Sequence, residues 1–446
     1  MAAVSPARKT AFAVLMAVER GQSHSDDLLR AKAVDALSAP DRNLATALVL
    51  GVLRWQIWLD HQLQVLLKRP NAKLDPEIRI ALRLGAFQIL HMDRIPARAA
   101  IDESVELAKQ AGHRFASGMV NAVLRKLSAT RFDFSEENAA ELALAQAHPI
   151  WMVERWASFY GLETARAICR HGQRQPTMTV RIESPAVEVE LAEAGVVLQS
   201  GELLTSARTV VSGDVTATPA YHEGRVRLQD EGSQLVAEIA GQGSAILDCC
   251  AAPGGKTLIL AERNPEASIV ACEFSAPRLE HLCKRLVGFE DRIECRLADA
   301  AELAEESVFD LALADVPCSG TGTLGRNPEI RHRLHLEDLL RQTERQRAIL
   351  CAALRAIRPG GRVVYSTCSL EPEENEQVVG AVLADAPNAR PLPLGPRIEA
   401  LLTEGILTPS GAERLSCCLT PQGALRLLPG AFHTDGFFIA AMEKTA

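Results

Sequence analysis

Apolar positions in the first 130 residues recur at the spacing of α-helices. Residues three and four apart share one face of a helix, so each apolar stripe indicates a face turned toward a common core. Pro70, Pro96 and Gly112 interrupt the pattern, which predicts an all-helical bundle with short connections. The helical stretches are TAFAVLMAVERG (10–21), RNLATALVLGVLRWQIWLDHQLQVLL (42–67), PEIRIALRLGAFQILHM (76–92), DESVELAKQA (102–111) and GMVNAVLRKL (118–127).

The pattern becomes mixed between residues 131 and 235. SEENAAELALAQA (135–147), MVERWASFYG (152–161) and ETARAICRHGQ (163–173) predict helices. Short runs with period-2 alternation follow, as is typical of half-buried strands. We therefore expect a linker helix and a small α+β subdomain, with strands in TMTVRI (177–182), GVVLQ (195–199) and RVRLQ (225–229).

From residue 236 onward, strand and helix patterns alternate. This alternation predicts a doubly wound α/β sheet with right-handed crossovers. We expect Pro359, Gly360 and Gly361 to end the third helix, and Pro372 to lie in the first turn of the fourth. The predicted strands are 244–250, 267–274, 292–299, 309–317 and 362–369, the predicted helices are 253–264, 275–289, 336–361 and 372–386, and 424–430 with 436–444 should form a closing hairpin.

Composition is typical of a soluble protein with more than one domain. A chain of 446 residues exceeds a single hydrophobic core, which predicts two or three domains. The sequence has no run of about 18 apolar residues and no signal-peptide pattern, so we expect a cytoplasmic protein. Its eleven cysteines include no C-x-x-C pair, so a zinc site is not supported and reduced thiols are expected.

The net charge of −8 is unevenly divided along the chain. Residues 1–130 carry +6, and the remainder carries −14. A basic helical segment suits an anionic partner such as nucleic acid, although an excess of this size is also common scatter. Within the acidic remainder, we expect Arg326, Arg331 and Arg333 to line an RNA path.

A glycine-rich turn, DCCAAPGGKT (248–257), follows the first strand of the α/β region. A phosphate-binding P-loop requires glycine where Cys250 stands, and the G-x-G-x-x-G dinucleotide fingerprint is absent. S-adenosylmethionine, which has no phosphate to cradle, is the remaining candidate ligand. Glu273 and Asp299 end the next two strands, where one carboxylate can accept from the ribose hydroxyls and the other from the adenine amino group.

Two cysteines follow the fourth and fifth strands. Cys318 lies in ADVPCSGTG (314–322), and Cys368 lies in STCS (366–369). Paired strands lie about 4.8 Å apart, so we expect both thiols at the same carboxyl edge of the sheet, beside the cofactor. A single cysteine is usually a small apolar filler, but two at adjacent strand ends favour nucleophilic chemistry.

A thiolate beside a methyl donor suits methylation at carbon. Addition of the thiolate to C6 of cytosine turns the ring into an enamine, whose C5 can then take the methyl group. Methylation of exocyclic amines is disfavoured, because Cys318 stands where such enzymes place an aromatic residue. Asp315 either accepts from the cytosine N4 amino group or, when protonated, donates to N3. Pro317 restricts the turn, and Lys256 either touches the base or supports packing.

Several blocks resemble the RNA cytosine-5 methyltransferases of the RsmB/NOP family, which includes the RsmB (Sun/Fmu) and NSUN types. They are RVRLQDEGSQLVAEIAG, DCCAAPGGKT, ADVPCSGTG with RNPEI, YSTCSLEPEENE and LPGAFHTDGFFIAAMEK. DRNLATALVLGVLRWQIWLD, IPARAAIDESVELAK and GMVNAVLRKL resemble the NusB-like RNA-binding domain of the bacterial 16S ribosomal RNA branch. The chain departs from the family pattern at Arg98, Glu183, Glu273 and Val316, where histidine, asparagine, aspartate and alanine are common.

The resemblance implies a class I S-adenosylmethionine methyltransferase with a Rossmann-like sheet at residues 236–446. It also implies a NusB-like helical RNA-binding domain at 1–130 and a linker helix with a small α+β subdomain at 131–235. In this family Cys368 would be the nucleophile, Cys318 would help to release the product, and Asp315 would complete the catalytic set. DNA cytosine-5 methyltransferases instead use the cysteine of the "PC" block and lack the second one. The implied cofactor-binding residues are Cys250, Ala251, Ala252, Pro253, Gly254, Gly255, Lys256, Glu273, Arg278, Asp299 and Asp315.

The implied function is S-adenosylmethionine-dependent methylation of C5 of one cytosine in 16S ribosomal RNA, free or partly assembled. We expect a monomer that needs no metal ion and no membrane. The alternatives are a tRNA cytosine-5 methyltransferase, a DNA cytosine methyltransferase and a NusB-like RNA-binding assembly factor. The basic bundle favours ribosomal RNA over tRNA, and the intact Cys318, Cys368 and Asp315 argue against an assembly factor.

Overall fold

The computed structural model describes residues 4–70, 73–132 and 134–445, and its internal contacts divide the chain into two units. Unit 1 comprises residues 1–175 and 324–333, and unit 2 comprises residues 176–323 and 334–446. The chain therefore leaves unit 2 after Thr323 and returns to it at Leu334. The sequence boundaries at 130 and 235 stay a prediction, because these units follow contacts rather than sequence blocks.

Unit 1 is helical, as the apolar pattern predicted. Proline stands in the first turn of α1, α4 and α5, where its missing N–H leaves no hydrogen bond unmade. The apolar helix faces enclose one core, which includes Leu48, Leu59, Leu82 and Leu124. The helices are α1 (Pro6–Glu19), α2 (Ser25–Leu29), α3 (Lys32–Asp35), α4 (Ala39–Leu66), α5 (Pro76–His91), α6 (Ala97–Gln110), η1 (Arg114–Ala116), α7 (Ser117–Ala129), α8 (Ala139–Ala145), α9 (Ile150–Tyr160), α10 (Leu162–Gln173) and α16 (Ile330–Arg333).

The segment 324–333 is held inside unit 1, which corrects one prediction. Arg331 is only 2% exposed, and its Nη1 donates to the carbonyl oxygens of Arg54 and Ala147 at 3.0 and 3.1 Å. Burial lowers the pKa of Arg331 to about 9. The prediction that Arg331 lines an RNA path is therefore wrong, because its guanidinium group satisfies backbone carbonyls in the interior. Arg333 is half-buried.

Unit 2 begins with a small antiparallel sheet, as expected for an α+β subdomain. Its strand order is β2-β3-β1-β4, with β1 (Thr179–Ile182) in the interior beside β4 (Val226–Leu228). The strand β3 (Ala207–Ser212) was missing from the sequence prediction. Val180 and Leu191 belong to the core under this sheet. The other elements are β2 (Val197–Ser200), α11 (Pro185–Glu193), η2 (Val215–Ala217) and α12 (Pro219–His222).

The larger sheet of unit 2 has the strand order β10-β12-β9-β8-β5-β6-β7, with β11 beside β12. Five neighbouring strands, β7, β6, β5, β8 and β9, run parallel to one another, and β12 runs antiparallel to β9. The predicted closing hairpin is confirmed, because β11 pairs antiparallel with β12. The strands are β5 (Ala245–Asp248), β6 (Ser268–Glu273), β7 (Ile293–Leu297), β8 (Phe309–Asp315), β9 (Ile357–Thr367), β10 (Ala389–Leu392), β11 (Leu425–Leu427) and β12 (Phe437–Lys444).

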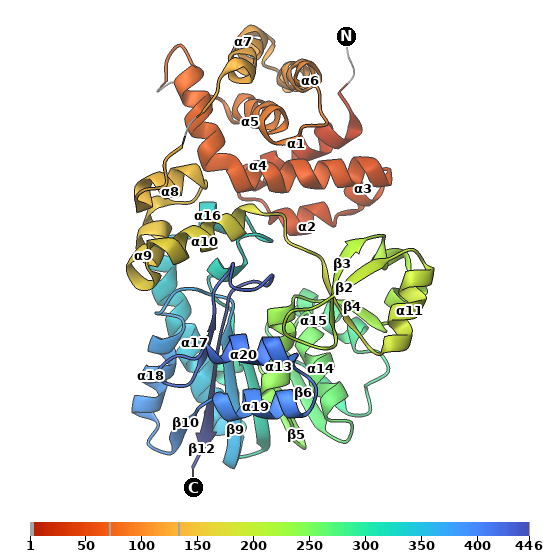
Figure 1. The fold of residues 1–446 in the computed structure, drawn as a ribbon, viewed down its shortest axis with the longest axis vertical. Helices are drawn as coiled ribbons and strands as arrows, with labels where there is room; N and C mark the ends of the chain where they lie inside the picture. Colours follow the sequence, from red (N-terminus) through yellow and green to blue (C-terminus); the bar gives the residue numbers. More distant parts are fainter. Residues whose placement is uncertain (1–3, 71–72, 133, 446) are drawn as a thin grey trace. The chain divides into compact units, whose positions relative to one another are not determined.

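Helices cover both faces of this sheet, with α17 and α18 on one side and α13 and α19 on the other (Figure 1). Successive strand residues point to opposite faces, so Leu311 and Leu313 belong to one core while Ala312 and Ala314 belong to the other. The helices and short turns are α13 (Glu231–Ala240), α14 (Gly255–Arg263), α15 (Ala276–Arg285), η3 (Ala300–Glu302), η4 (Thr321–Thr323), α17 (Leu336–Ala356), α18 (Glu376–Asp385), α19 (Gly395–Thr403) and α20 (Pro409–Ser416).

Two helix boundaries differ from the prediction. The helix α17 ends at Ala356, and Pro359 to Gly361 lie in β9 instead of closing the helix. Proline clashes with the preceding turn of a helix, so the helical conformation stops before it. The helix α18 begins at Glu376 rather than near Pro372, because the side chains of Glu374 and Asn375 bind residues next to Cys318 and Cys368 instead.

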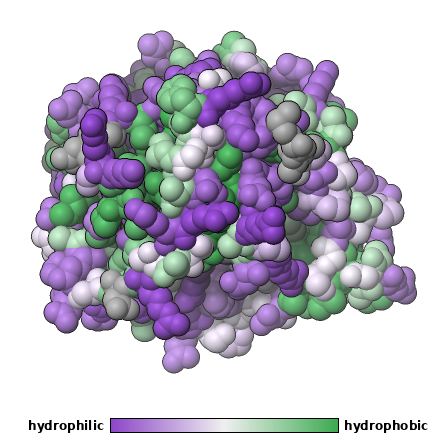
Figure 2. Space-filling model, turned by 90° about the horizontal axis from the view of Figure 1, so that it is seen from above, coloured by the Kyte–Doolittle hydropathy of each residue, from purple (hydrophilic) through white to green (hydrophobic). Residues whose placement is uncertain are grey.

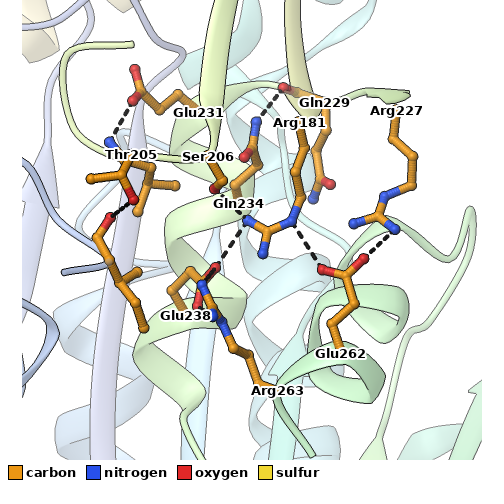
Figure 3. Close-up of polar contacts among 12 residues, drawn as sticks. Arg181, Thr205, Ser206, Arg227, Gln229, Glu231, Gln234, Glu238, Glu262 and Arg263 are labelled. Carbon is orange, nitrogen blue, oxygen red and sulfur yellow. Dashed lines mark hydrogen bonds and ion pairs between the residues drawn. The ribbon is translucent and has the colours of Figure 1, made fainter. Parts of the chain in front are cut away.

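An ion-pair cluster joins the small sheet to α13 and α14 of the same unit (Figure 3). Arg181 of β1 places Nη1 2.9 Å from Glu238 Oε1 and Nε 3.1 Å from Glu262 Oε2. Arg263 Nε lies 2.7 Å from the second Glu238 oxygen. The Glu238 side chain is fully buried, so these pairs compensate a charge that would otherwise be costly. The cluster fixes α14, whose first turn belongs to the candidate site.

Hydrophilic residues cover most of the face drawn in Figure 2, and hydrophobic residues lie between them in small groups. Single exposed apolar side chains are normal on protein surfaces. Among the exposed large apolar side chains is Phe115 in η1, at 82%. Across the described ranges, no helix combines the length and the apolar character needed to cross a membrane.

Candidate active site

The turn between β5 and α14 brings backbone atoms to the carboxyl edge of the sheet. Gly254 has a left-handed φ of 97°, and a Cβ there would lie 2.9 Å from Leu282 Cδ1. A Cβ on Gly255 would lie 3.2 Å from the carboxamide of Gln229. Gly254 therefore needs glycine, a Cβ at Gly255 would press on Gln229, and a turn without side chains at these points suits the close approach of a ligand.

The predicted cofactor residues from Cys250 to Lys256 all lie on this turn or in the first turn of α14. Ala251 N donates to the Cys272 carbonyl of β6 at 2.9 Å, which ties the turn to the neighbouring strand. Burial raises the pKa of Cys250 well above its ordinary value, so this side chain stays a neutral thiol. The turn is thus a fixed backbone cradle.

Glu273 and Arg278 meet beside this cradle. The Glu273 carboxylate, at the end of β6, is 4% exposed and accepts from Ser275 N at 2.9 Å. Arg278 Nη1 lies 3.5 Å from Glu273 Oε1, and Arg278 Nη2 donates to the Ala252 carbonyl at 3.0 Å. The guanidinium group therefore connects the glycine turn to the acid that the sequence assigned to the ribose.

Asp299 lies one strand further along the same edge. Its Oδ1 accepts from Ala301 N at 3.0 Å, and Arg345 Nη2 lies 3.6 Å from its Oδ2. Sequence reasoning missed Phe274, which is 61% exposed directly after Glu273, with the Arg345 guanidinium 4.9 Å from its ring centroid. An exposed aromatic residue immediately after a strand-end acid is the signal that would have identified it.

Lys256 and Asp315 form the centre of the site. Lys256 Nζ lies 2.6 Å from Asp315 Oδ2, and Ser366 Oγ donates to Asp315 Oδ1 at 2.6 Å. Burial alone would lower the pKa of Lys256, but the charges of Asp315, Cys368 and Asp248 outweigh it and raise that pKa. Lys256 is therefore a buried ammonium group that interacts with an acid and a thiol.

Asp248, at the end of β5, was not among the predicted site residues. Its Oδ2 accepts from Thr257 Oγ1 at 2.8 Å, and the side chain is 1% exposed. Burial raises the pKa of Asp248 to about 7, and the charge of Asp315 adds to this effect. Asp248 is thus a second carboxyl group close to the Lys256–Asp315 pair, and it holds its proton below about pH 7.

The structure brings the two predicted cysteines together. Strands β8 and β9 are parallel neighbours in which Asp315 pairs with Ser366, and Cys318 Sγ lies 3.4 Å from Cys368 Sγ. Both residues are half-buried. The hydrogen bond to Cys368 and then burial raise the pKa of the Cys318 thiol well above its ordinary value, and the charges of Cys368 and Glu374 add to this rise. The Cys318 thiol therefore keeps its proton.

A mainly parallel sheet with an antiparallel strand β12, a glycine turn after its first parallel strand and acids at the following strand ends defines a class I S-adenosylmethionine methyltransferase fold. Family models match three stretches of the chain: the NusB family at 5–129, the RsmF/B-like ferredoxin-like domain at 148–207, and the 16S rRNA methyltransferase RsmB/F at 239–443. The probable ribosomal RNA small subunit methyltransferase B of Bacillus subtilis is 33% identical over 98% of both chains. The ribosomal RNA small subunit methyltransferase B of Pseudomonas putida is 32% identical over 98% of both chains. The chain belongs to the ribosomal RNA small subunit methyltransferase B family.

Solved structures share this fold. The crystal structure of the protein PH0851 superposes with a TM-score of 0.78 at 24% identity, covering 99% of this chain and 100% of that one. A methyltransferase homologue from Pyrococcus horikoshii has a TM-score of 0.55 at 26% identity, covering 69% of this chain and 98% of its own.

Proposed function

We propose that this protein transfers a methyl group from S-adenosylmethionine to C5 of a cytosine in 16S ribosomal RNA. The observation that carries the proposal is the thiol pair, Cys318 and Cys368, with 3.4 Å between the sulfur atoms at the carboxyl edge of the sheet. The Lys256–Asp315 ion pair lies at the same edge. The curated relatives are named as small-subunit ribosomal RNA methyltransferases, which supports the choice of RNA.

The residues at the glycine turn fit S-adenosylmethionine. The cofactor supplies an electrophilic methyl group on a sulfonium centre when it is bound. Gly254 and Gly255 leave room that a Cβ would fill, Glu273 offers carboxylate oxygens to the ribose hydroxyls, and Asp299 accepts from the adenine amino group. Phe274 gives the flat adenine ring an aromatic surface.

Covalent catalysis assigns different roles to the two thiols. The Cys368 thiolate attacks C6 of cytosine, and the ring electrons that this displaces make C5 nucleophilic. After methylation, water takes the proton from C5, the electrons of that C–H bond restore the C5–C6 double bond, and the C6–sulfur bond breaks with its electron pair returning to the Cys368 sulfur. Cys318, as the neighbouring thiol, donates a hydrogen bond to the departing sulfur.

Asp315 holds the cytosine edge in this scheme. Its carboxylate is fixed between Lys256 and Ser366, and its remaining lone pairs accept from the N4 amino group. Unit 1 would bind the RNA backbone through its basic side chains, since the first 130 residues carry a net charge of +6. We expect the protein to act as a monomer on free or partly assembled small-subunit RNA.

Alanine variants of the two cysteines test the proposal. We expect Cys318→Ala and Cys368→Ala both to lose turnover with S-adenosylmethionine and 16S ribosomal RNA. A covalent RNA–protein adduct should accumulate in Cys318→Ala, because the first attack still occurs, and it should be absent from Cys368→Ala. Denaturing gel electrophoresis with labelled RNA measures the adduct.

Cys283→Ala is the matched control, because Cys283 is exposed on α15 and should leave both signals unchanged. An adduct that forms with Cys368→Ala and disappears with Cys318→Ala would overturn the roles and favour a DNA-type mechanism. Methylation of tRNA transcripts in preference to 16S ribosomal RNA would overturn the substrate. RNA binding without any methyl transfer in the wild type would favour an assembly factor.

A further inference from the structure

A buried carboxylate, Glu374, lies directly behind the Cys318 turn. Its side chain is fully buried, and Oε1 accepts from Ser319 N at 2.8 Å and from Gln346 Nε2 at 2.9 Å. Its Oε2 accepts from Ser319 Oγ. In the part of the chain that the structure describes, no cation pairs with Glu374. Hydrogen bonds alone therefore compensate the burial of this charge, which is an expensive arrangement for a residue with only a structural role.

The hydrogen bonds of Glu374 reach both sides of Cys318. Gln346 of α17, which donates to Glu374, also lies within hydrogen-bond distance of the Pro317 carbonyl, with Nε2 at 2.9 Å. Ser319 is bound through both its N–H and its hydroxyl. The residues before and after Cys318 are thus held from one point. A side chain fixed at both neighbours has little freedom to move its sulfur atom.

The same network continues to Cys368. Ser319 Oγ lies 3.0 Å from Ser369 Oγ, so the residues that follow the two cysteines are in direct contact. Tyr365 of β9 donates from its hydroxyl to the Glu374 carbonyl at 2.6 Å. Glu374 therefore connects the turn that carries one thiol to the strand and turn that carry the other.

We propose that Glu374 is a positioning residue for the release step: it holds the Cys318 turn against Cys368, so that the Cys318 sulfur stays beside the sulfur that departs from the cytosine. This inference rests on the proposed function, because it assigns a cause to the division of labour between the thiols. Glu374 acts through Ser319 and Gln346 and does not itself touch the RNA base.

The charge of Glu374 acts on the Cys318 thiol, so its removal has a measurable signature. The hydrogen bond to Cys368 and burial are the largest causes that raise the pKa of Cys318, and the negative charge of Glu374 raises it further. A carboxylate close to a thiol disfavours its ionisation, since two like charges repel in a medium of low polarity. Removal of the charge should lower the pKa of Cys318, which thiol alkylation can detect.

Glu374→Gln keeps the volume of the side chain and removes its charge. Alkylation with iodoacetamide between about pH 7 and pH 10, followed by tryptic mass spectrometry, measures thiol ionisation without RNA or cofactor. The two cysteines fall in separate peptides, 297–326 and 363–397, and each peptide contains no other cysteine. We expect Cys318 in E374Q to react about tenfold faster near pH 8 than in the wild type.

Methylation assays with 16S ribosomal RNA test the consequence for release. We expect kcat of E374Q to fall about tenfold or more, KM for RNA to stay unchanged, and the covalent adduct to accumulate as in Cys318→Ala. Glu376→Gln is the matched control, since Glu376 pairs with Arg426 and should leave Cys318 reactivity and the adduct level at wild-type values.

Ser319→Ala gives a second variant that retains the buried charge and the Ser319 N–H contact. It should raise the adduct level while changing the pH dependence of Cys318 alkylation little. Wild-type alkylation of Cys318 and wild-type adduct levels in a folded E374Q protein would overturn the inference. If the wild type forms no adduct at all, the proposed function fails, whereas the alkylation result still decides whether Glu374 controls the Cys318 thiol.

Discussion

Replacing Asp248 by asparagine should remove a large part of the pH dependence of the stability of unit 2. Asp248 is 1% exposed, and burial raises its pKa to about 7 from the value of 3.8 that applies to the unfolded chain. Between these two values only the folded state holds the proton, so raising the pH favours unfolding. The stabilising contribution is complete below pH 3.8 and is lost as the pH rises through about 7.

The size of the effect follows from the two pKa values of Asp248. The whole difference is worth ~4 kcal/mol in the free energy of unfolding, and ~3 kcal/mol of it falls between about pH 5 and about pH 8. Asparagine keeps the volume and the acceptor oxygen that Thr257 Oγ1 binds. D248N should therefore gain stability relative to the wild type as the pH rises, with the difference growing by ~3 kcal/mol over that range.

Urea denaturation followed by far-ultraviolet circular dichroism measures this difference. Tryptophan fluorescence follows unit 1 separately, because the four tryptophans are Trp55, Trp58, Trp151 and Trp156. Asp310→Asn is the control: burial tends to raise the pKa of Asp310, but hydrogen bonds from Ser244 lower it, so its difference from the wild type should be flat over the same range. Parallel pH curves for D248N and the wild type would refute the reasoning.

Two further substitutions test the cradle and the inserted segment. Gly254→Ala should weaken the binding of S-adenosylhomocysteine about tenfold in calorimetry, because the left-handed φ of 97° and the 2.9 Å approach to Leu282 both disfavour a Cβ. Gly380→Ala is the control and should bind normally, since Gly380 lies in α18 with open space around it. Equal affinities for the two variants would contradict the role of the glycine turn. Arg331→Met should lower the stability of unit 1 by ~3 kcal/mol, since the carbonyls of Arg54 and Ala147 lose a charged donor, and an unchanged tryptophan-fluorescence midpoint in urea would contradict this.

Local sequence patterns were sufficient to predict the regular alternation of strands and helices in unit 2. This alternation predicted the larger sheet. The expectation that its fourth and fifth strands are neighbours predicted that Cys318 lies beside Cys368. The structure confirms this placement, with 3.4 Å between the two sulfur atoms. This adjacency was expected for the type of sheet that the glycine turn and the strand-end acids indicated, since connection rules alone leave the strand order open.

The remaining features depend on contacts between distant residues. Glu374 looks like an ordinary acid in the first turn of a helix, but the helix begins only at Glu376, because the Glu374 carboxylate and the Asn375 carboxamide bind Ser319 and Thr367. Arg331 looks like a surface arginine, since no local signal indicates that its segment leaves unit 2. Asp248 shows no sign of its raised pKa, which comes from burial that only the folded chain creates.

The path of segment 324–333 has a consequence for how this protein can be divided. Because the chain passes between the units at residues 175, 323 and 333, no single cut separates them. A fragment that starts at residue 176 would keep segment 324–333 without the helices that enclose it. Arg331 would then be exposed to water, and the Gly325 carbonyl would lose the donor Arg54, which the fragment lacks. Fusions, split reporters and truncations should therefore keep the polypeptide whole. The segment that returns to unit 1 begins only six residues after Cys318.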